Sequence, residues 1–219
     1  MKYKLVIFDL DGTLADSSLG ILNSISYTQE LLCLPPIKQE EKLTFIGPTN
    51  RESYNKVFGL KGETLQKAVN YHKEYAMKQG YKELKLYDGI IDLLNDLKKK
   101  DIITAVATLK AQSTTLKIFE HLGITDKFDI IKGVDSLNPK TKAQLLEDCI
   151  EEAKCEKTEC VLIGDSKYDA IGAEQLDVDF IGVTYGFGFK SYDDLAGYKF
   201  VGVTNTVKNL RTLLGYNAL

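Results

Sequence analysis

Short apolar runs alternate along the chain with longer segments in which apolar residues recur every three to four positions. The runs are apolar throughout rather than alternating with polar residues, which is typical of strands buried on both faces of a sheet. Helix-like segments lie between the later runs, at 89–100, 113–123, 142–154 and 168–177. We therefore predict an α/β fold with a parallel sheet, whose strands lie near 4–8, 102–107, 128–132, 160–164, 179–183 and 199–203.

The segment 15–84 differs from the rest of the chain. It contains two helix-period stretches, 19–32 and 63–79, separated by turn-rich pieces, and no convincing strand. The pattern predicts two domains. Residues 1–14 and 85–219 would form the α/β core, and residues 15–84 would form an all-helical insertion.

Composition places the protein among ordinary globular proteins. Of its 219 residues, 44% are hydrophobic and 27% are charged, which fits neither a disordered nor a membrane-spanning chain. The net charge is −3 and the basic residues are scattered, so no nucleic-acid partner is expected. No apolar run approaches membrane length, and the run after Lys4 is too short for a signal peptide, so we expect a cytoplasmic protein with no membrane partner.

The four cysteines give no sign of a metal or disulfide site. They form no C-x-x-C pair, and a reducing compartment fits this usage. A cysteine-based phosphatase would need an arginine near its thiolate, but the two arginines, Arg51 and Arg211, lie close in sequence to none of the cysteines. That mechanism is therefore excluded.

Polar residues follow three of the predicted strands. Asp9 follows "VIF", Thr108 follows "TAVA", and Asp165 follows "VLIG". In an open α/β sheet, ligands bind outside the carboxyl ends of the strands, so these side chains are expected at one edge. Each motif alone has a simpler explanation, as a turn or a helix cap. Together they would repel one another unless a cation joined them, and all-oxygen ligands suit Mg²⁺ with a phosphate group.

The combination of motifs resembles the haloacid dehalogenase-like (HAD) hydrolase superfamily. The motifs are "FDLDGTL" (8–14), "VAT" (106–108), a lysine in "NPKTKAQLL" and "IGDSKYD" (163–169). A helical insertion after the first motif is similar to the helical-cap subgroup, which includes phosphoglycolate phosphatases and 5′-nucleotidases. The resemblance implies a doubly wound, Rossmann-like parallel sheet core with an inserted all-helical cap.

The resemblance also implies roles for the paired acids and the metal. Asp9 matches the nucleophile, which forms an aspartyl-phosphate intermediate. Asp11 matches the general acid and base; two residues apart in an extended segment, both side chains face the same way. Asp165 matches a Mg²⁺ ligand, alongside the Asp9 carboxylate and the Asp11 backbone carbonyl. Asp169, one helical turn on, would support the site.

Thr108 matches the hydroxyl that binds the phosphoryl group. Leu109 follows it where many relatives carry a small polar residue, so only its backbone N–H would serve the phosphate. The lysine of the third motif is expected to be Lys142, which opens an apolar helix, with Lys140 as the alternative. Arg51, in the segment resembling the part of the cap that faces the active site, is a candidate for binding an anionic group of the substrate, and equally a solvated helix residue.

Two further features are expected to lie outside the chemistry. His72 and His121 lie in helical segments far from the acidic motifs and are interpreted as structural or surface residues. The "GFGF" at 186–189 lacks the third glycine of a dinucleotide-binding motif, and a loop beside the active site is the preferred interpretation.

These expectations favour a Mg²⁺-dependent phosphatase that acts on a small phosphorylated metabolite. Phosphoglycolate is the first candidate substrate and a nucleoside monophosphate the second. A phosphomutase retains both aspartates and stays an alternative, whereas a dehalogenase requires neither the second aspartate nor a metal. A phosphoacceptor signalling module is a remote alternative, because it would lack the helical insertion. We expect a monomer or weak homodimer.

Overall fold

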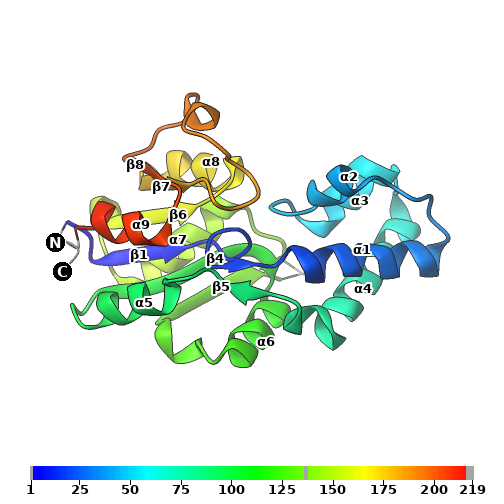
Figure 1. Ribbon diagram of the computed structural model, residues 1–219, viewed down its shortest axis with the longest axis horizontal. Coiled ribbons are helices and arrows are strands. Elements are labelled where there is room, and N and C mark those ends of the chain that lie inside the picture. Colours follow the sequence, from blue (N-terminus) through cyan, green and yellow to red (C-terminus); the bar gives the residue numbers. More distant parts are fainter. Residues whose placement is uncertain (1, 136–137, 216–219) are drawn as a thin grey trace.

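A single parallel sheet forms the centre of the core in the computed structural model, which describes residues 2–135 and 138–215. Its strand order is β5-β4-β1-β6-β7-β8 (Figure 1). The strands are β1 (Leu5–Phe8), β4 (Ile103–Ala111), β5 (Ile130–Val134), β6 (Cys160–Gly164), β7 (Asp179–Val183) and β8 (Gly202–Thr204). The predicted α/β fold with a doubly wound parallel sheet is thus confirmed.

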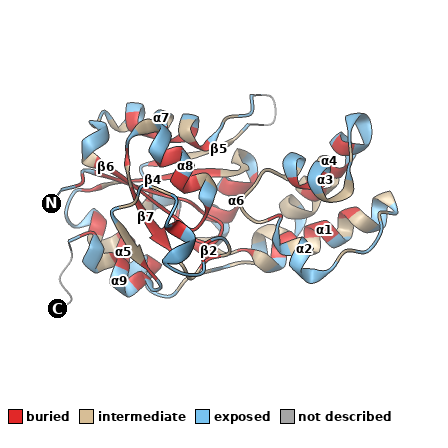
Figure 2. Ribbon diagram, turned by 90° about the horizontal axis from the view of Figure 1, so that it is seen from above, coloured by how far each residue is buried: buried red, intermediate tan, exposed pale blue. Residues whose placement is uncertain are grey.

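Helices cover both faces of this sheet, as the run of apolar strand residues predicts. One face packs on α5 (Ile90–Lys98), α6 (Gln112–Leu122) and α9 (Val207–Leu213), and the other packs on α7 (Lys142–Ala153) and α8 (Lys167–Leu176). Figure 2 shows the buried strands between exposed helix surfaces. Successive residues of β1 alternate between the two cores: Val6 and Phe8 pack on one face, and Leu5 and Ile7 on the other.

Three strands differ from their predicted ranges by two residues or more. β5 lies at Ile130–Val134 rather than at 128–132, a shift of two residues toward the C-terminus. β4 continues to Ala111, past the predicted end at 107, because its last residue pairs with Val134 of β5 after a register shift. β8 begins at Gly202 rather than at 199, and only three of its residues pair with β7 at the edge of the sheet. Edge strands have one neighbour, so their apolar pattern marks their limits less sharply.

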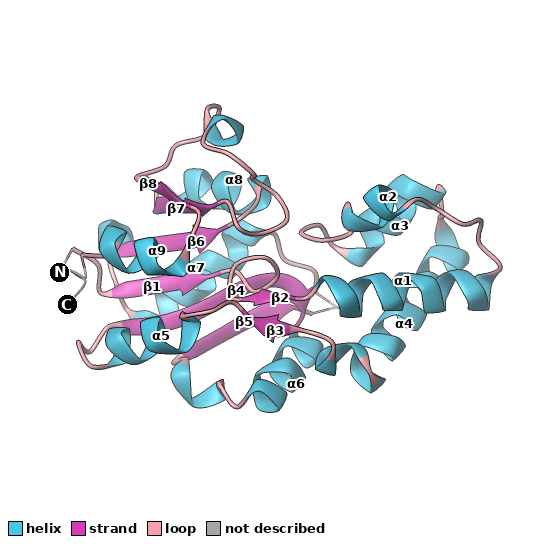
Figure 3. Cartoon of the chain, viewed as in Figure 1, coloured by secondary structure: helices cyan, strands magenta, loops and turns pink. Residues whose placement is uncertain are grey.

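Residues 15–84 are largely helical and lie beside the core (Figure 3). Their own apolar cluster joins Ile25, Phe45, Tyr54 and Ala68. Two short strands, β2 (Ala15–Asp16) and β3 (Lys85–Leu86), pair antiparallel where this segment leaves and rejoins the core. The helices are α1 (Ser18–Leu32), α2 (Gln39–Leu43), α3 (Asn50–Phe58) and α4 (Gly62–Lys78). We call residues 15–84 the cap.

Short 3₁₀ helices and side-chain contacts complete the structure. The 3₁₀ helices are Gly80–Lys82, Thr125–Lys127, Lys157–Glu159 and Asp193–Leu195. Hydrogen bonds join the cap to the core on both sides of the cavity region: the Tyr168 hydroxyl donates to Glu52 at 2.9 Å, and the Lys117 ammonium donates to the Met77 carbonyl at 2.6 Å. Among the described residues, no helix is both long and apolar enough to cross a membrane.

Candidate active site

The carboxyl ends of the central strands bring together the polar residues that the sequence singled out. β1 lies between β4 and β6 at the centre of the sheet, where the chain order reverses, and this is the expected ligand position in such sheets. Asp9 follows β1, Thr108 lies in β4, and Asp165 follows β6. All three are buried, as is Asp11.

Lys142 connects two of the acidic residues. Its ammonium donates to Asp9 Oδ1 at 2.6 Å and to the Ala107 carbonyl at 2.7 Å, and it lies 2.7 Å from Asp169 Oδ1. The lysine is the first residue of α7, which begins with a capping box between Thr141 and Gln144. The helix start therefore sets the position of the cation. Lys140 instead pairs with Asp148 at 2.5 Å, away from Asp9.

Asp169 has a second structural contact at the start of α8. It accepts hydrogen bonds from the Ser166 backbone N–H at 3.1 Å and from the Ser166 hydroxyl at 2.6 Å. The Ser166 and Asp169 pair is thus the capping box of this helix. Because Asp169 is fully buried and fixed by this cap, it helps to hold Lys142 in place beside Asp9.

A glycine-rich loop fixes Asp165. The backbone N–H groups of Phe187 and Gly188 donate to Asp165 Oδ2 at 2.6 and 3.0 Å. This places "GFGF" beside the site, as expected for a loop rather than a dinucleotide motif. Gly12 packs on the same carboxylate at φ +87°, and a Cβ there would lie 2.3 Å from Asp165 Oδ2. Glycine is therefore required at this turn after Asp11.

Burial and crowding shift the pKa values of the acids upward. Burial raises the pKa of Asp9 to about 8; Lys142 opposes this shift, while Asp169, Asp165 and Asp11 add to it. Burial, reinforced by Asp169, raises the pKa of Asp165 to about 6. For Lys142, burial alone would lower the pKa, but Asp169 and Asp9 raise it overall. The site thus has more buried negative charge than Lys142 alone neutralises.

A divalent cation fits this charge imbalance. Carboxylate oxygens of Asp9, Asp165 and Asp169 lie within 4.8 Å of one another, and Asp169 is already engaged by Lys142 and Ser166. Asp11 Oδ1 is buried without a hydrogen-bond partner. Oxygen donors of this kind are the ligands that Mg²⁺ prefers. Asp9 and Asp165 are therefore the carboxylates best placed to hold such an ion.

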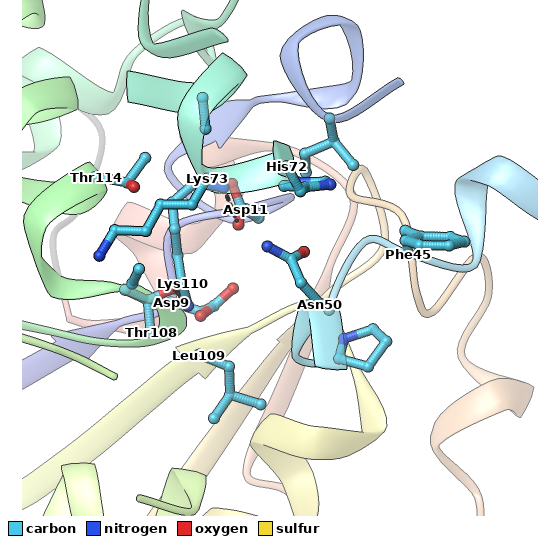
Figure 4. A pocket seen from close by; sticks show the side chains of 15 residues that line it. Asp9, Asp11, Phe45, Asn50, His72, Lys73, Thr108, Leu109, Lys110 and Thr114 are labelled. Atoms are coloured by element: carbon cyan, nitrogen blue, oxygen red, sulfur yellow. Dashed lines mark hydrogen bonds and ion pairs between the residues drawn. The ribbon is translucent and has the colours of Figure 1, made fainter. Parts of the chain in front are cut away.

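Asp9 and Asp11 face a cavity between the cap and the core, with a volume of about 60 Å³ (Figure 4). Thr108 and Leu109 line it from the core. Asp11 Oδ2 pairs with the Lys110 ammonium at 2.8 Å. The cap contributes aromatic, amide, imidazole and ammonium groups, from Phe45, Asn50, His72 and Lys73.

Several of the cavity residues were not singled out by the sequence. The structure places Lys110, Asn50, His72 and Lys73 at the cavity, and His72 is therefore buried beside the site rather than remote from it. Arg51 does not line the cavity: it is exposed and donates to Gln66, while its neighbour Asn50 faces the site. Two of these positions had a signal in the sequence: Lys110 lies two residues after Thr108, and Asn50 lies next to Arg51 in the segment expected to face the active site.

The sequence of this chain is similar to those of known proteins. Residues 6–183 fit the model of the haloacid dehalogenase-like hydrolase family. A tyrosine-protein kinase of Mycobacterium tuberculosis is 32% identical over 97% of this chain and 72% of its own length. A 5′-nucleotidase of Pseudomonas aeruginosa is 30% identical over 91% of this chain and 90% of its own. A phosphoglycolate phosphatase of Agrobacterium fabrum is 29% identical, covering 84% and 81%.

A solved structure shows the same fold. A haloacid dehalogenase-like family hydrolase from Streptococcus pneumoniae superposes with a TM-score of 0.88 at 29% identity, covering 97% of this chain and 99% of that one. The match therefore includes the cap as well as the core. With its sequence motifs, its sheet and its family match in agreement, this chain belongs to the haloacid dehalogenase-like hydrolase family.

Proposed function

We propose that this protein is a Mg²⁺-dependent phosphatase that hydrolyses a small phosphate monoester through an aspartyl-phosphate intermediate on Asp9. One observation carries the proposal. Asp9 and Asp11 face the cavity between the cap and the core, and Lys142 contacts Asp9 at 2.6 Å. A carboxylate nucleophile beside a proton donor and a fixed cation is the arrangement that phosphoryl transfer to an aspartate needs.

The proposed reaction has two steps. A carboxylate oxygen of Asp9 attacks phosphorus, the bond to the ester oxygen breaks, and Asp11 gives its proton to that oxygen. In the second step Asp11 takes a proton from water, which attacks phosphorus, breaks the bond to Asp9 and releases inorganic phosphate. Thr108 and the Leu109 N–H would hold the phosphoryl oxygens, and Lys142 would offset their charge. Asp169 would keep Lys142 in position.

The metal would be held by the Asp9 and Asp165 carboxylates and the Asp11 backbone carbonyl. When bound, Mg²⁺ supplies positive charge that lets the anionic nucleophile approach the anionic phosphate. Its presence would also relieve the upward pKa shift of Asp9, since an opposite charge favours the ionised form. The Phe187 and Gly188 N–H groups leave the second oxygen of Asp165 as the available ligand.

The size of the cavity supports a small substrate. A volume of about 60 Å³ holds only a few water-sized groups, since one water needs roughly 10–15 Å³ on this scale. A glycolate-sized leaving group fits, whereas a nucleoside would require the cap to move away. Phosphoglycolate is therefore the first candidate substrate. A nucleoside monophosphate is the second, favoured by the 5′-nucleotidase relative.

The test is phosphate release from a panel of monoesters, each with Mg²⁺ and with excess chelator. The panel includes 2-phosphoglycolate, adenosine and uridine 5′-monophosphates, and glucose 1-phosphate. The proposal predicts turnover that requires Mg²⁺ and favours the smallest esters. Equal turnover in chelator, or release from none of the panel, would contradict it. Conversion of glucose 1-phosphate to an isomer without phosphate release would indicate a mutase instead.

A further inference from the structure

The cavity contains two lysines that the proposed chemistry does not use. Lys110, from the core, and Lys73, from α4 of the cap, both line it. Figure 4 shows them on the side of the cavity that also holds Thr114, opposite Phe45 and Asn50. The phosphoryl group already has Lys142, so two further cations beside it call for another explanation.

The ionic contacts of the two lysines differ. Lys110 pairs with Asp11 at 2.8 Å and is mostly buried, with 15% of its side chain exposed. An ammonium has three N–H donors, and this contact uses one of them. Lys73 forms no ion pair or hydrogen bond with any residue in the described parts of the chain. It is thus a cation at the cavity for which none of the described residues provides a counter-charge.

Neighbouring lysines differ from Lys73, because they have acidic partners. Lys73 also lines an open groove next to the cavity, together with Lys132 and Lys140. Lys132 pairs with Glu152, and Lys140 pairs with Asp148. Lys132 and Lys140 therefore each have an acidic partner, whereas Lys73, which lines both the groove and the cavity, has none among the residues that the structure describes.

The rest of the cap side of the cavity carries no negative charge. Among the described residues that line the cavity, the carboxylates are Asp9 and Asp11, and both come from the core. His72 stays uncharged near neutral pH, because burial, reinforced by the charge of Lys110, lowers its pKa to about 3. The Tyr54 hydroxyl lies 3.1 Å from His72 Nδ1 and fixes the ring. The leaving group would thus meet neutral polar groups and an unpaired cation.

We propose that Lys73 and Lys110 form a subsite for a second anionic group, a carboxylate or a phosphate, carried by the leaving group of the substrate. This inference rests on the proposed function and narrows its substrate class to small monoesters with a second anion near the ester oxygen. Lys73 supplies the uncompensated charge from the cap, and Lys110 bridges Asp11 and the anion from the core. The second anion would also hold the cap against the core, because it contacts one lysine of each.

The test compares substrates with and without the second anionic group. 2-Phosphoglycolate is paired with its neutral amide, carbamoylmethyl phosphate, and ethane-1,2-diol bisphosphate is paired with 2-hydroxyethyl phosphate. For wild type we expect kcat/KM to favour the anionic member of at least one pair by roughly 10- to 100-fold, the size of a charge-assisted hydrogen bond. The pair with the larger ratio identifies the anion as carboxylate or phosphate.

The decisive variant is Lys73→Met. Its ratio of kcat/KM for the anionic substrate to kcat/KM for the neutral one should fall at least fivefold, and Lys73→Arg should restore part of this ratio. Lys67→Met is the matched control, since Lys67 is an exposed lysine of the same helix that pairs with Glu63. Its ratio should equal that of wild type. A wild-type ratio near one for both pairs, or an unchanged ratio in Lys73→Met, would overturn the inference while leaving the phosphatase proposal intact.

Direct binding separates this inference from the reaction itself. Calorimetry with Asp9→Asn and Mg²⁺ measures affinity for each pair without turnover. We expect Asp9→Asn to bind an anionic member about tenfold more tightly than its neutral partner, and the double variant with Lys73→Met to lose this preference. That result would support the subsite even if no phosphate were released from any substrate. Equal affinities within both pairs would overturn it.

Discussion

At the scale of single residues, Lys142 is the cation on which the site depends. It is 5% exposed and contacts Asp9, Asp169 and the Ala107 carbonyl. A buried cation with two carboxylates is costly to disrupt, because removal of one partner leaves uncompensated buried charge. Lys140, two residues earlier, makes one partly exposed ion pair with Asp148. The two neighbouring lysines should therefore respond very differently to substitution.

Replacing Lys142 with methionine should lower kcat by at least 100-fold, the usual cost of removing a preorganised charge from a transition state. It should also lower the free energy of unfolding, by about 3 kcal/mol. Lys140→Met should change kcat less than twofold, and stability by less than about 1 kcal/mol. Steady-state phosphate release and urea unfolding measure both. Greater loss of activity in Lys140→Met than in Lys142→Met would reverse the assignment.

His72 predicts a specific pH dependence of stability. Its pKa is lowered to about 3 in the folded protein, against the ordinary value of 6.5. Below pH 6.5 the unfolded state therefore binds a proton that the folded state does not, and stability falls as the pH is lowered further. Between pH 7 and pH 5 this residue should lower the free energy of unfolding of wild type by about 2 kcal/mol.

The measurement is urea unfolding of wild type and His72→Gln at pH 7 and pH 5. The neutral variant should lose about 2 kcal/mol less than wild type between the two pH values. If both proteins lost the same free energy of unfolding, His72 would be protonated in the folded state, and the assignment of a neutral buried ring would be wrong.

At the scale of elements, the close packing of α7 on α8 sets the position of Lys142. Gly172 of α8 lies against the aliphatic part of the lysine, and a Cβ at this position would lie 2.6 Å from Lys142 Cγ. Glycine is unfavourable inside a helix by about 1 kcal/mol relative to alanine, so its presence here follows from this contact. The helix contact and the site are thus coupled.

Gly172→Ala should therefore reduce both stability and activity, although alanine is the better helix former. Overpacking should cost about 1–3 kcal/mol, and displacement of Lys142 should reduce kcat about tenfold or more. Gly197→Ala is the control, because an added Cβ there meets nothing within 4 Å. A Gly172→Ala variant as active and stable as wild type would show that the packing of α8 does not restrict the position of Lys142.

Most elements of the core follow from the sequence, because buried parallel strands are apolar throughout and their helices are amphipathic. The first strand and the motif "IGDSKYD" illustrate this, and the predicted strands all have counterparts in the sheet. In the cap, α2 and α3 were not predicted as separate helices. They are short and lie beside the turn-rich pieces 34–36 and 46–50; α3, for example, begins after a Thr49 cap that accepts from the Glu52 N–H.

The candidate site divides in the same way. Asp9 and Asp165 directly follow buried strands, and Thr108 lies in the last part of β4, so the sequence could bring these residues together and favour Lys142. The cap residues at the cavity depend on how two helices pack over the core, and the local sequence does not record that packing. Hence the sequence points to Arg51 rather than to its neighbour Asn50, and it gives no signal for Lys73.

At the scale of the whole molecule, Mg²⁺ should act as a stabilising ligand. Binding to the folded state alone adds about 2.7 kcal/mol at a concentration 100 times Kd. For a protein of 219 residues this should raise Tm by roughly 5–10 °C. Asp165→Asn should lose most of this increase, because it removes one of the two carboxylates proposed to hold the ion.

Thermal unfolding with and without Mg²⁺ measures this effect. Asp177→Asn is a suitable control, since Asp177 is an acid of the protein surface that pairs with Lys199. It should show the full wild-type increase in Tm. If Asp165→Asn also retained the full increase, the metal would be bound elsewhere.

The most direct test of the central claim is the activity of Asp9→Asn, which keeps the shape of the side chain and removes the nucleophile. With 2-phosphoglycolate, or the best substrate of the panel, and saturating Mg²⁺, we expect phosphate release to fall at least 10³-fold while the circular dichroism spectrum stays that of wild type. An Asp9→Asn protein that retains more than a tenth of wild-type kcat would contradict an aspartyl-phosphate mechanism at this site.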